Sequence, residues 1–131
     1  GGAGASPYEL DFNPLNSRLY IACSPYHNVN RAAIYQVDAY GLTKRAFVAI
    51  GDGGEDAGGG VAVDTATSNV FITNSRANTV SVITGLTDTV IATVPTGRDP
   101  FGVAVDPLTR RVYIVNRRSS DLTVLQDSFP P

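Results

Sequence analysis

Three carboxylates lie within one glycine-rich stretch of the sequence, GDGGEDAGG, which covers residues 51–59. Carboxylate oxygens are hard ligands of the kind that Ca²⁺ and Mg²⁺ prefer, so Asp52, Glu55 and Asp56 are the candidate metal ligands. Their spacing does not match an EF-hand loop, and a solvated connector has the same composition. We therefore predict no metal or other cofactor, and name these three residues as the place where Ca²⁺ or Mg²⁺ would bind. The glycines do not predict a phosphate-binding loop, because no helix follows them.

The single cysteine and the single histidine are close in sequence, at Cys23 and His27. A thiol next to an imidazole can act as a nucleophile with its base, or as half of a zinc site. No second histidine completes a zinc shell, so Cys23 is interpreted as a small buried side chain and His27 as a polar loop residue. One cysteine also excludes an internal disulfide. We predict no catalytic residue in this chain.

These two stretches are loops within a pattern that repeats along the chain. Short segments of alternating character come first in each repeat, at residues 10–13, 61–64 and 103–106. Turn residues follow, and then apolar runs at residues 18–23, 69–74 and 111–116. Alternation with a period of two indicates β-strands, and the intervening Asn, Asp and Pro residues are typical of hairpin turns. A repeat of about 40 to 50 residues indicates a propeller or a solenoid.

Two further segments complete each repeat. The third strand is expected at residues 34–37, 80–83 and 122–125, and the fourth at residues 46–50 and 89–94. The last repeat ends before a fourth segment, and no segment has sustained helical periodicity. We predict an all-β fold, a partial (half) β-propeller of three blades, built of four-stranded antiparallel sheets with the last blade incomplete. The expected bounds are a flexible segment 1–6, blade 1 at 7–58, blade 2 at 59–99 and blade 3 at 100–131, all in one domain.

The repeats also resemble a known family. Tyr113-Ile114-Val115-Asn116 and Phe71-Ile72-Thr73-Asn74 are similar to the motif that names the YVTN β-propeller repeats, and residues 88–97 and 100–106 follow that repeat closely. In the first repeat Cys23 stands where the motif has asparagine. The resemblance implies a propeller, usually of more than three blades and often in extracellular, periplasmic or cell-surface proteins. It implies no activity, because propellers serve both as enzymes and as binding modules.

The strand pattern predicts which side chains are buried. The core is expected to contain Val61, Val63, Val70, Ile72, Val103, Val105, Val112 and Ile114. The turns around Asn16 and Thr109 are expected to be exposed.

The charge and hydropathy of the chain argue against two classes of partner. A formal net charge of −2 does not predict nucleic-acid binding, which needs a concentrated cationic surface. The pairs Arg110-Arg111 and Arg117-Arg118 flank opposite ends of one strand, so they cannot form one patch. Apolar runs are far shorter than the roughly 18 residues that a membrane-spanning segment requires.

The differences between repeats concentrate in the loops after the second and fourth strands, which open on the same face of an antiparallel blade. The first repeat has extra residues in both loops, and function concentrates in loops that a rigid scaffold positions. The predicted ligand-binding face consists of Tyr26, His27, Asn28, Arg31, Asp52, Glu55, Asp56, Arg98, Asp99, Arg117 and Arg118. We predict a non-catalytic binding scaffold for a protein or glycan. The alternative is part of a lactonase- or lyase-like propeller enzyme with a divalent metal at the channel mouth.

Three blades do not close a propeller, since closure takes about four to eight blades. The outer sheet faces of the first and last blades are therefore expected to lack a neighbour. A homodimer could cover them by closing a six-bladed ring, and further blades of a longer chain would do the same. We expect the homodimer.

Overall fold

The structure is a computed structural model that describes residues 7–26, 29–52 and 59–130. These residues form strands and turns and contain no helix. The strands are β1 (Pro7–Asn13), β2 (Arg18–Tyr26), β3 (Val29–Asp38), β4 (Gly41–Asp52), β5 (Val61–Asp64), β6 (Asn69–Asn74), β7 (Thr79–Thr84), β8 (Thr89–Pro95), β9 (Pro100–Asp106), β10 (Arg111–Asn116) and β11 (Asp121–Gln126). In the described ranges, no helix has the length and hydropathy needed to cross a bilayer.

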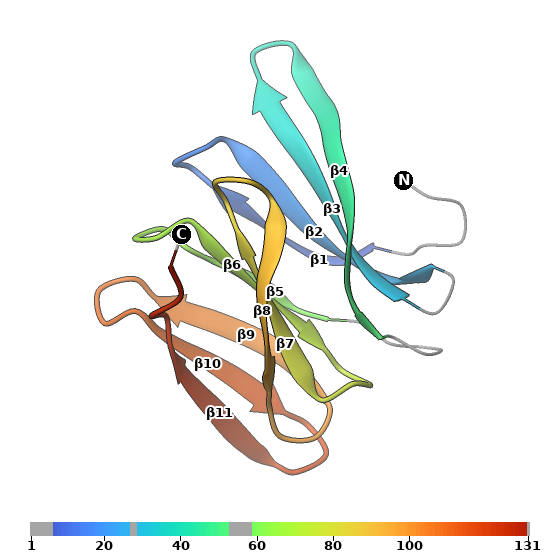
Figure 1. Cartoon of the computed structure of the whole chain (residues 1–131), viewed down its shortest axis with the longest axis vertical. Helices are drawn as coiled ribbons and strands as arrows, with labels where there is room; N and C mark the ends of the chain where they lie inside the picture. The colour runs from blue at the N-terminus through green and yellow to red at the C-terminus, as the bar shows by residue number, and fades with distance from the viewer. Residues whose placement is uncertain (1–6, 27–28, 53–58, 131) are drawn as a thin grey trace.

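The strands pair in sequence order into three antiparallel sheets, β1 to β4, β5 to β8 and β9 to β11. We call these sheets blades 1, 2 and 3. Figure 1 shows them fanned one after another, and β5 contacts both β1 and β9. The prediction of a partial β-propeller with a three-stranded last blade is therefore confirmed.

The first hairpin turn of every blade has the same chemistry. A side-chain oxygen at its first residue accepts a hydrogen bond from the backbone two residues later, from 2.9 to 3.0 Å, in Asn13, Asp64 and Asp106. The fourth residue after that first residue has a left-handed φ of 56, 66 and 61°, in Ser17, Ser68 and Arg110. Short Asx hydrogen bonds of this kind stabilise tight turns, which explains why the same spacing recurs.

The core lies between the blades in two clusters. We call the side of a blade that faces the preceding blade its backward face, and the other side its forward face. In β6, Val70 and Ile72 are on the backward face and pack against blade 1, whereas Phe71 is on the forward face and packs against blade 3. All of β6 is buried, as expected for a strand between two neighbouring sheets.

Three details differ from the sequence predictions. Val103 and Val105 are half-buried, because β9 has a neighbour such as β5 on one side only within the described chain. Asn16 is also half-buried, since its amide donates to the Tyr20 hydroxyl at 3.1 Å. The third strand of blade 1 is shifted by two residues from the predicted repeat alignment, which matched Ile34 with Val80. In the structure Ile34 pairs with Tyr20 as Val82 pairs with Phe71.

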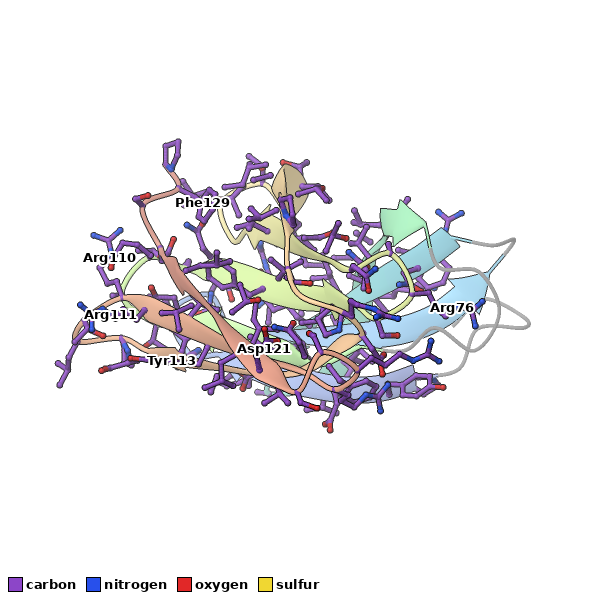
Figure 2. All side chains as sticks on the ribbon, turned by 90° about the horizontal axis from the view of Figure 1, so that it is seen from below. Arg76, Arg110, Arg111, Tyr113, Asp121 and Phe129 are labelled. Atoms are coloured by element: carbon purple, nitrogen blue, oxygen red, sulfur yellow. The ribbon has the colours of Figure 1, made fainter. Side chains whose placement is uncertain are left out.

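Two sheet faces lack a neighbouring blade. The backward face of blade 1 exposes Leu10 (58%) and Phe12 (39%). The forward face of blade 3 exposes Tyr113 (36%), Val115 (47%) and Val124 (53%), and Figure 2 shows Tyr113 at this surface. The prediction that the first and last blades have uncovered apolar faces is therefore confirmed for the described residues.

A polar corner joins blades 1 and 2. Asp88 of blade 2 accepts hydrogen bonds from the Arg18 guanidinium and the Tyr20 hydroxyl, both at 2.8 Å. Arg45 lies 3.3 Å from the same carboxylate. Burial raises the pKa of Tyr20 to about 12, so the hydroxyl stays protonated and donates to Asp88.

The blades also meet through their backbones near the inner strands. The amide of Gly60 donates to the carbonyl oxygen of Phe101 at 3.1 Å, and the hydroxyl of Thr73 donates to the same oxygen at 2.8 Å. A Cβ atom on Gly60 would lie 2.3 Å from that oxygen, which no side chain tolerates. Glycine at this position therefore allows the backbones of blades 2 and 3 to come into direct contact.

Candidate functional site

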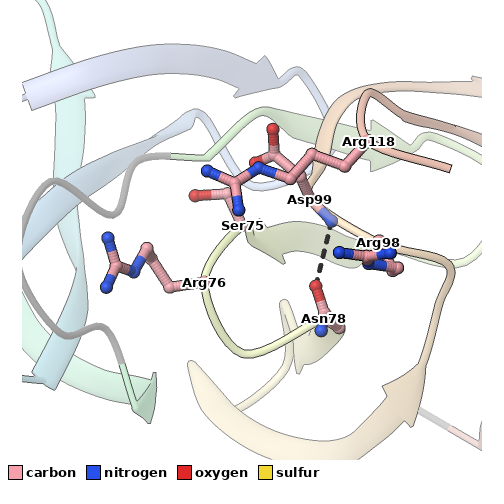
Figure 3. Close-up of a pocket in the computed structure, with 6 residues that line it drawn as sticks. All are labelled: Ser75, Arg76, Asn78, Arg98, Asp99 and Arg118. Atoms are coloured by element: carbon pink, nitrogen blue, oxygen red, sulfur yellow. Dashed lines mark hydrogen bonds between the residues drawn. The ribbon is translucent and has the colours of Figure 1, made fainter. Parts of the chain in front are cut away.

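A polar pocket of about 310 Å³ lies on the loop face that the sequence predicted. It is lined by residues from three connections, β6–β7, β8–β9 and β10–β11, so blades 2 and 3 both contribute. The lining residues are Ser75, Arg76, Asn78, Arg98, Asp99 and Arg118. In Figure 3 the Arg118 side chain extends toward Ser75 and Arg98 lies beside Asn78, whereas the Arg76 side chain extends to the left, away from Arg98.

Hydrogen bonds hold these three connections together. The Asp99 amide donates to the Asn78 side-chain oxygen at 2.9 Å, as the dashed line in Figure 3 marks. The Arg117 amide donates to the Asp99 carbonyl at 2.9 Å, and the Arg118 amide donates to the Arg98 carbonyl at 3.1 Å. The pocket is therefore built on a backbone network, and its walls do not depend on side-chain packing alone.

The pocket carries an excess of positive charge. Asp99 is paired with Arg117 through two parallel hydrogen bonds of 3.0 Å each. The Arg117 guanidinium also stacks over the Phe101 ring, 4.4 Å from its centroid. Within the described chain, the guanidinium groups of Arg76, Arg98 and Arg118 have no acidic partner.

The structure brings together part of the predicted binding face. Arg98, Asp99, Arg117 and Arg118 gather around or beside the pocket. Arg31 is apart from them, on the backward face of blade 1, where its guanidinium lies 5.6 Å from the Phe47 ring centroid.

The other predicted face residues are on blade 1. Tyr26 and Asp52 are the last residues of β2 and β4, and their side chains lie outside the described part of the structure. His27, Asn28, Glu55 and Asp56 lie outside the described residues altogether. Among the side chains that are described, no three or more of His, Cys, Asp and Glu gather as a metal site would require.

The sequence analysis missed Ser75, Arg76 and Asn78. Arg76 is the second residue after β6, and Arg118 is the second residue after β10, so the two arginines occupy equivalent positions in adjacent repeats. The repeat alignment contained this signal. Loop length distinguishes only the first repeat, whereas this signal lies in matching positions of the other two repeats.

A second polar cluster lies away from this pocket, where the C-terminal segment crosses blade 2. Asp127 accepts hydrogen bonds from Thr67 at 2.6 Å and from Asn69 at 2.9 Å. Burial, together with a hydrogen bond to Asp127, raises the pKa of Asp64 to about 6. Burial acts against ionisation of Asp127 as well, but hydrogen bonds from Asp64, Thr67 and Asn69 hold its pKa below the usual range. This buried pair has a structural role.

The side chain of Cys23 is buried, as expected, and burial raises the pKa of its thiol. A raised pKa disfavours the reactive thiolate.

Comparisons with known proteins place the fold among β-propellers. No protein-family model matches the sequence, and no curated protein matches it. Among solved structures, the chain is similar to Kuenenia stuttgartiensis hydrazine synthase, with a TM-score of 0.75 and 17% identity, over 95% of this chain and 46% of that one. It is also similar to a protein from Lactobacillus plantarum, with a TM-score of 0.63 and 21% identity, over 94% and 42% of the two chains.

A third similar structure is a chain of the nidogen/laminin complex, with a TM-score of 0.58 and 15% identity, over 93% of this chain and 49% of that one. The chain thus spans a little less than half of each of these solved chains. At these identities the likeness supports the propeller fold and no particular activity.

Proposed function

We propose that this chain is a propeller repeat module that binds a protein or glycan ligand on its loop face. The observation that carries this proposal is the polar pocket where the loops of blades 2 and 3 meet. A concave site with convergent polar groups is the default place for a ligand, and loops on a rigid sheet scaffold are where binding residues gather. The proposal requires no catalytic group.

The test is binding of the purified chain to a glycan array and to a panel of purified surface proteins. We expect a ligand that is retained by the wild-type chain and lost by the double variant Arg98→Ala/Arg118→Ala. Leu108→Ala is the matched control, because Leu108 is 92% exposed in a turn at the opposite end of blade 3. Loss of the ligand in the control, or binding that survives the double variant, would contradict a ligand site on the loop face.

Two parts of the proposal come from the resemblance to YVTN repeats. One is membership of that family, and the other is a location outside the cell, in the periplasm or on the cell surface. The motif segments Phe71-Ile72-Thr73-Asn74 and Tyr113-Ile114-Val115-Asn116 occupy β6 and β10, the second strands of their blades, which supports treating them as one repeat. Localisation of a tagged natural protein tests the second part.

The proposal includes no cofactor. A metal that binds the native state at 100 times its Kd would stabilise it by about 2.7 kcal/mol. We expect millimolar Ca²⁺ or Mg²⁺ to leave the melting temperature unchanged. An increase of several degrees that Asp52→Asn abolishes would instead favour the enzyme alternative with a metal at the channel mouth.

We also propose that two copies close a six-bladed ring, with blade 3 of each packed on blade 1 of the other. The support is the equivalence of the repeats: exposed Tyr113 pairs with Val124 as buried Phe71 pairs with Val82. On the partner face, exposed Leu10 pairs with Ile21 as buried Val61 pairs with Ile72. Both open faces therefore have the construction of a blade–blade interface.

This contact is expected to be weaker than the one between blades 1 and 2. Arg111 and Tyr113 repeat the positions of Arg18 and Tyr20, which bind Asp88. The position of Asp88 in blade 2, directly before Thr89 of the fourth strand, corresponds to Leu42 in blade 1, directly before Thr43. Blade 1 of the partner copy therefore has no carboxylate at this position to bind Arg111 and Tyr113. We expect a dimer that dissociates on dilution. Light scattering tests this: a monomer at all concentrations, without aggregation, would refute the closed ring and require some other way of covering these faces.

A further inference from the structure

We propose that the loop-face pocket binds a polycarboxylate, a ligand with two or more carboxylate groups, through the guanidinium groups of Arg76, Arg98 and Arg118. The inference rests on the proposed use of the loop face for binding, and it adds the chemical class of the ligand.

The first argument is the charge of the pocket. Its one acidic side chain, Asp99, is neutralised by the two parallel hydrogen bonds from Arg117. The other charged side chains that line the pocket are the three arginines, and none of them has an acidic partner among the described residues. A neutral ligand would leave three like charges around one cavity, whereas an anionic ligand removes their repulsion.

The second argument is the position of the arginines. Arg76 and Arg118 come from equivalent positions in adjacent blades, and Arg98 comes from the connection between those blades. The backbone bond from Arg118 to Arg98 and the bond from the Asp99 amide to the Asn78 side-chain oxygen fix the three connections relative to one another. The loops need little ordering when a ligand arrives, and preorganisation of this kind lowers the free energy that binding must overcome.

The third argument concerns the shape of the ligand group. A guanidinium offers a planar fork of donors that matches a carboxylate, and Arg117 already binds Asp99 in this way beside the pocket. Three forks that belong to three separate connections cannot all be satisfied by one carboxylate. A ligand with several carboxylates can engage them together. Because the arginines are exposed, we expect the affinity to fall as salt is added.

The experiment is isothermal titration calorimetry of the full chain with citrate at low ionic strength. We expect saturable binding that Arg98→Gln and Arg118→Gln each weaken about tenfold or more, as the loss of one charge-assisted hydrogen bond predicts. The matched control is Arg110→Gln, which removes the same charge at the opposite end of blade 3, as the label in Figure 2 shows. It should change the affinity by less than about twofold. Unchanged circular dichroism and melting temperature establish that each variant is folded.

Sulfate is the second arm of the test. We expect it to bind at least about tenfold more weakly than citrate, because one compact anion cannot reach three separate guanidinium groups. Equal binding of sulfate and citrate, no binding of citrate, or equal loss of affinity in Arg110→Gln would overturn the inference. These outcomes are separate from the array experiment: a loop-face ligand without carboxylates would refute the polycarboxylate and leave the binding module standing. Citrate binding without any ligand on the array would support the polycarboxylate site and contradict the protein- or glycan-binding module.

Discussion

The second strands of blades 2 and 3 have nearly the same sequence pattern and opposite environments. All six residues of β6 are buried, whereas β10 alternates between buried and exposed residues. Phe71 is fully buried against blade 3, and Tyr113 at the equivalent position is 36% exposed. Because both side chains are aromatic and similar in size, the difference in exposure comes from the presence or absence of a neighbouring sheet.

This comparison separates what a repeat encodes from what its surroundings decide. The pattern encodes a strand that is apolar on both sides, and each side becomes core only where another blade covers it. In the described chain, blade 3 is therefore packed against blade 2 on its backward face and exposed on its forward face.

The largest difference is expected when the two aromatic side chains are truncated. Phe71→Ala should lower the free energy of unfolding by about 3 to 5 kcal/mol, because it leaves a cavity between blades 2 and 3. Tyr113→Ala should cost about 1 kcal/mol or less in dilute solution, because solvent already reaches that face. Urea denaturation of the two variants measures both values. Similar costs would mean that a neighbour covers blade 3 even at low concentration.

Removing single hydroxyl groups sharpens the same comparison. Tyr20→Phe should cost about 1 to 2 kcal/mol, since Asp88 loses a buried hydrogen bond of 2.8 Å. Tyr113→Phe at the equivalent position of blade 3 should be close to neutral, because no described residue bonds its hydroxyl. Thermal unfolding of both variants measures the difference, and a neutral Tyr20→Phe would show that the polar corner between blades 1 and 2 does not stabilise the fold.

The smallest expected effect concerns the carboxyl pair that ties the C-terminal segment to blade 2. The pKa of Asp64 is raised in the folded state to about 6, so its protonated form stabilises the fold. This contribution is complete below the unfolded-state pKa of about 4 and is lost as the pH rises through about 6. Asparagine cannot ionise, so Asp64→Asn should abolish the decrease in stability between pH 4 and 7.5. It should raise the free energy of unfolding by about 1 kcal/mol at pH 7.5.

Asparagine suits that position, because Asn13 makes the equivalent turn hydrogen bond in blade 1. Chemical denaturation between pH 4 and 7.5 gives the comparison, with Asp106→Asn in the exposed turn of blade 3 as the control. A wild-type stability that rises across this range, in parallel with the variant, would refute a raised pKa for Asp64.

The sequence predicted the blades well because their pattern is local. Alternation in the first strand, Asx residues in the turn and the apolar second strand each depend on a few neighbouring positions, so strand order and sheet composition followed. Exposure depends on contacts between blades and was harder to predict. Val103 and Val105 match Val61 and Val63 in sequence and pack against the core between blades 2 and 3, but they are only half-buried at the end of the row of blades.

The pocket was predicted in part for the same reason. Arg98, Asp99 and Arg118 were expected on one loop face and line the same pocket, since the face follows from the alternation of strand direction. Arg76 and Asn78 join them only because adjacent blades bring their loops together. The partnership of Asp64 with Asp127 likewise depends on how the C-terminal segment crosses blade 2, which no local pattern specifies.

The hydrogen bond between Gly60 and Phe101 has a geometric consequence for the angle between neighbouring blades. It brings blades 2 and 3 close together at their inner strands, while the bulky side chains of the second and third strands keep the sheets farther apart. The separation of adjacent blades therefore increases from the inner strands, where glycine allows close contact, to the middle strands, where residues such as Phe71 fill the space. The angle between adjacent blades decides how many of them complete a circle, so the volume of one core side chain helps to determine the blade number.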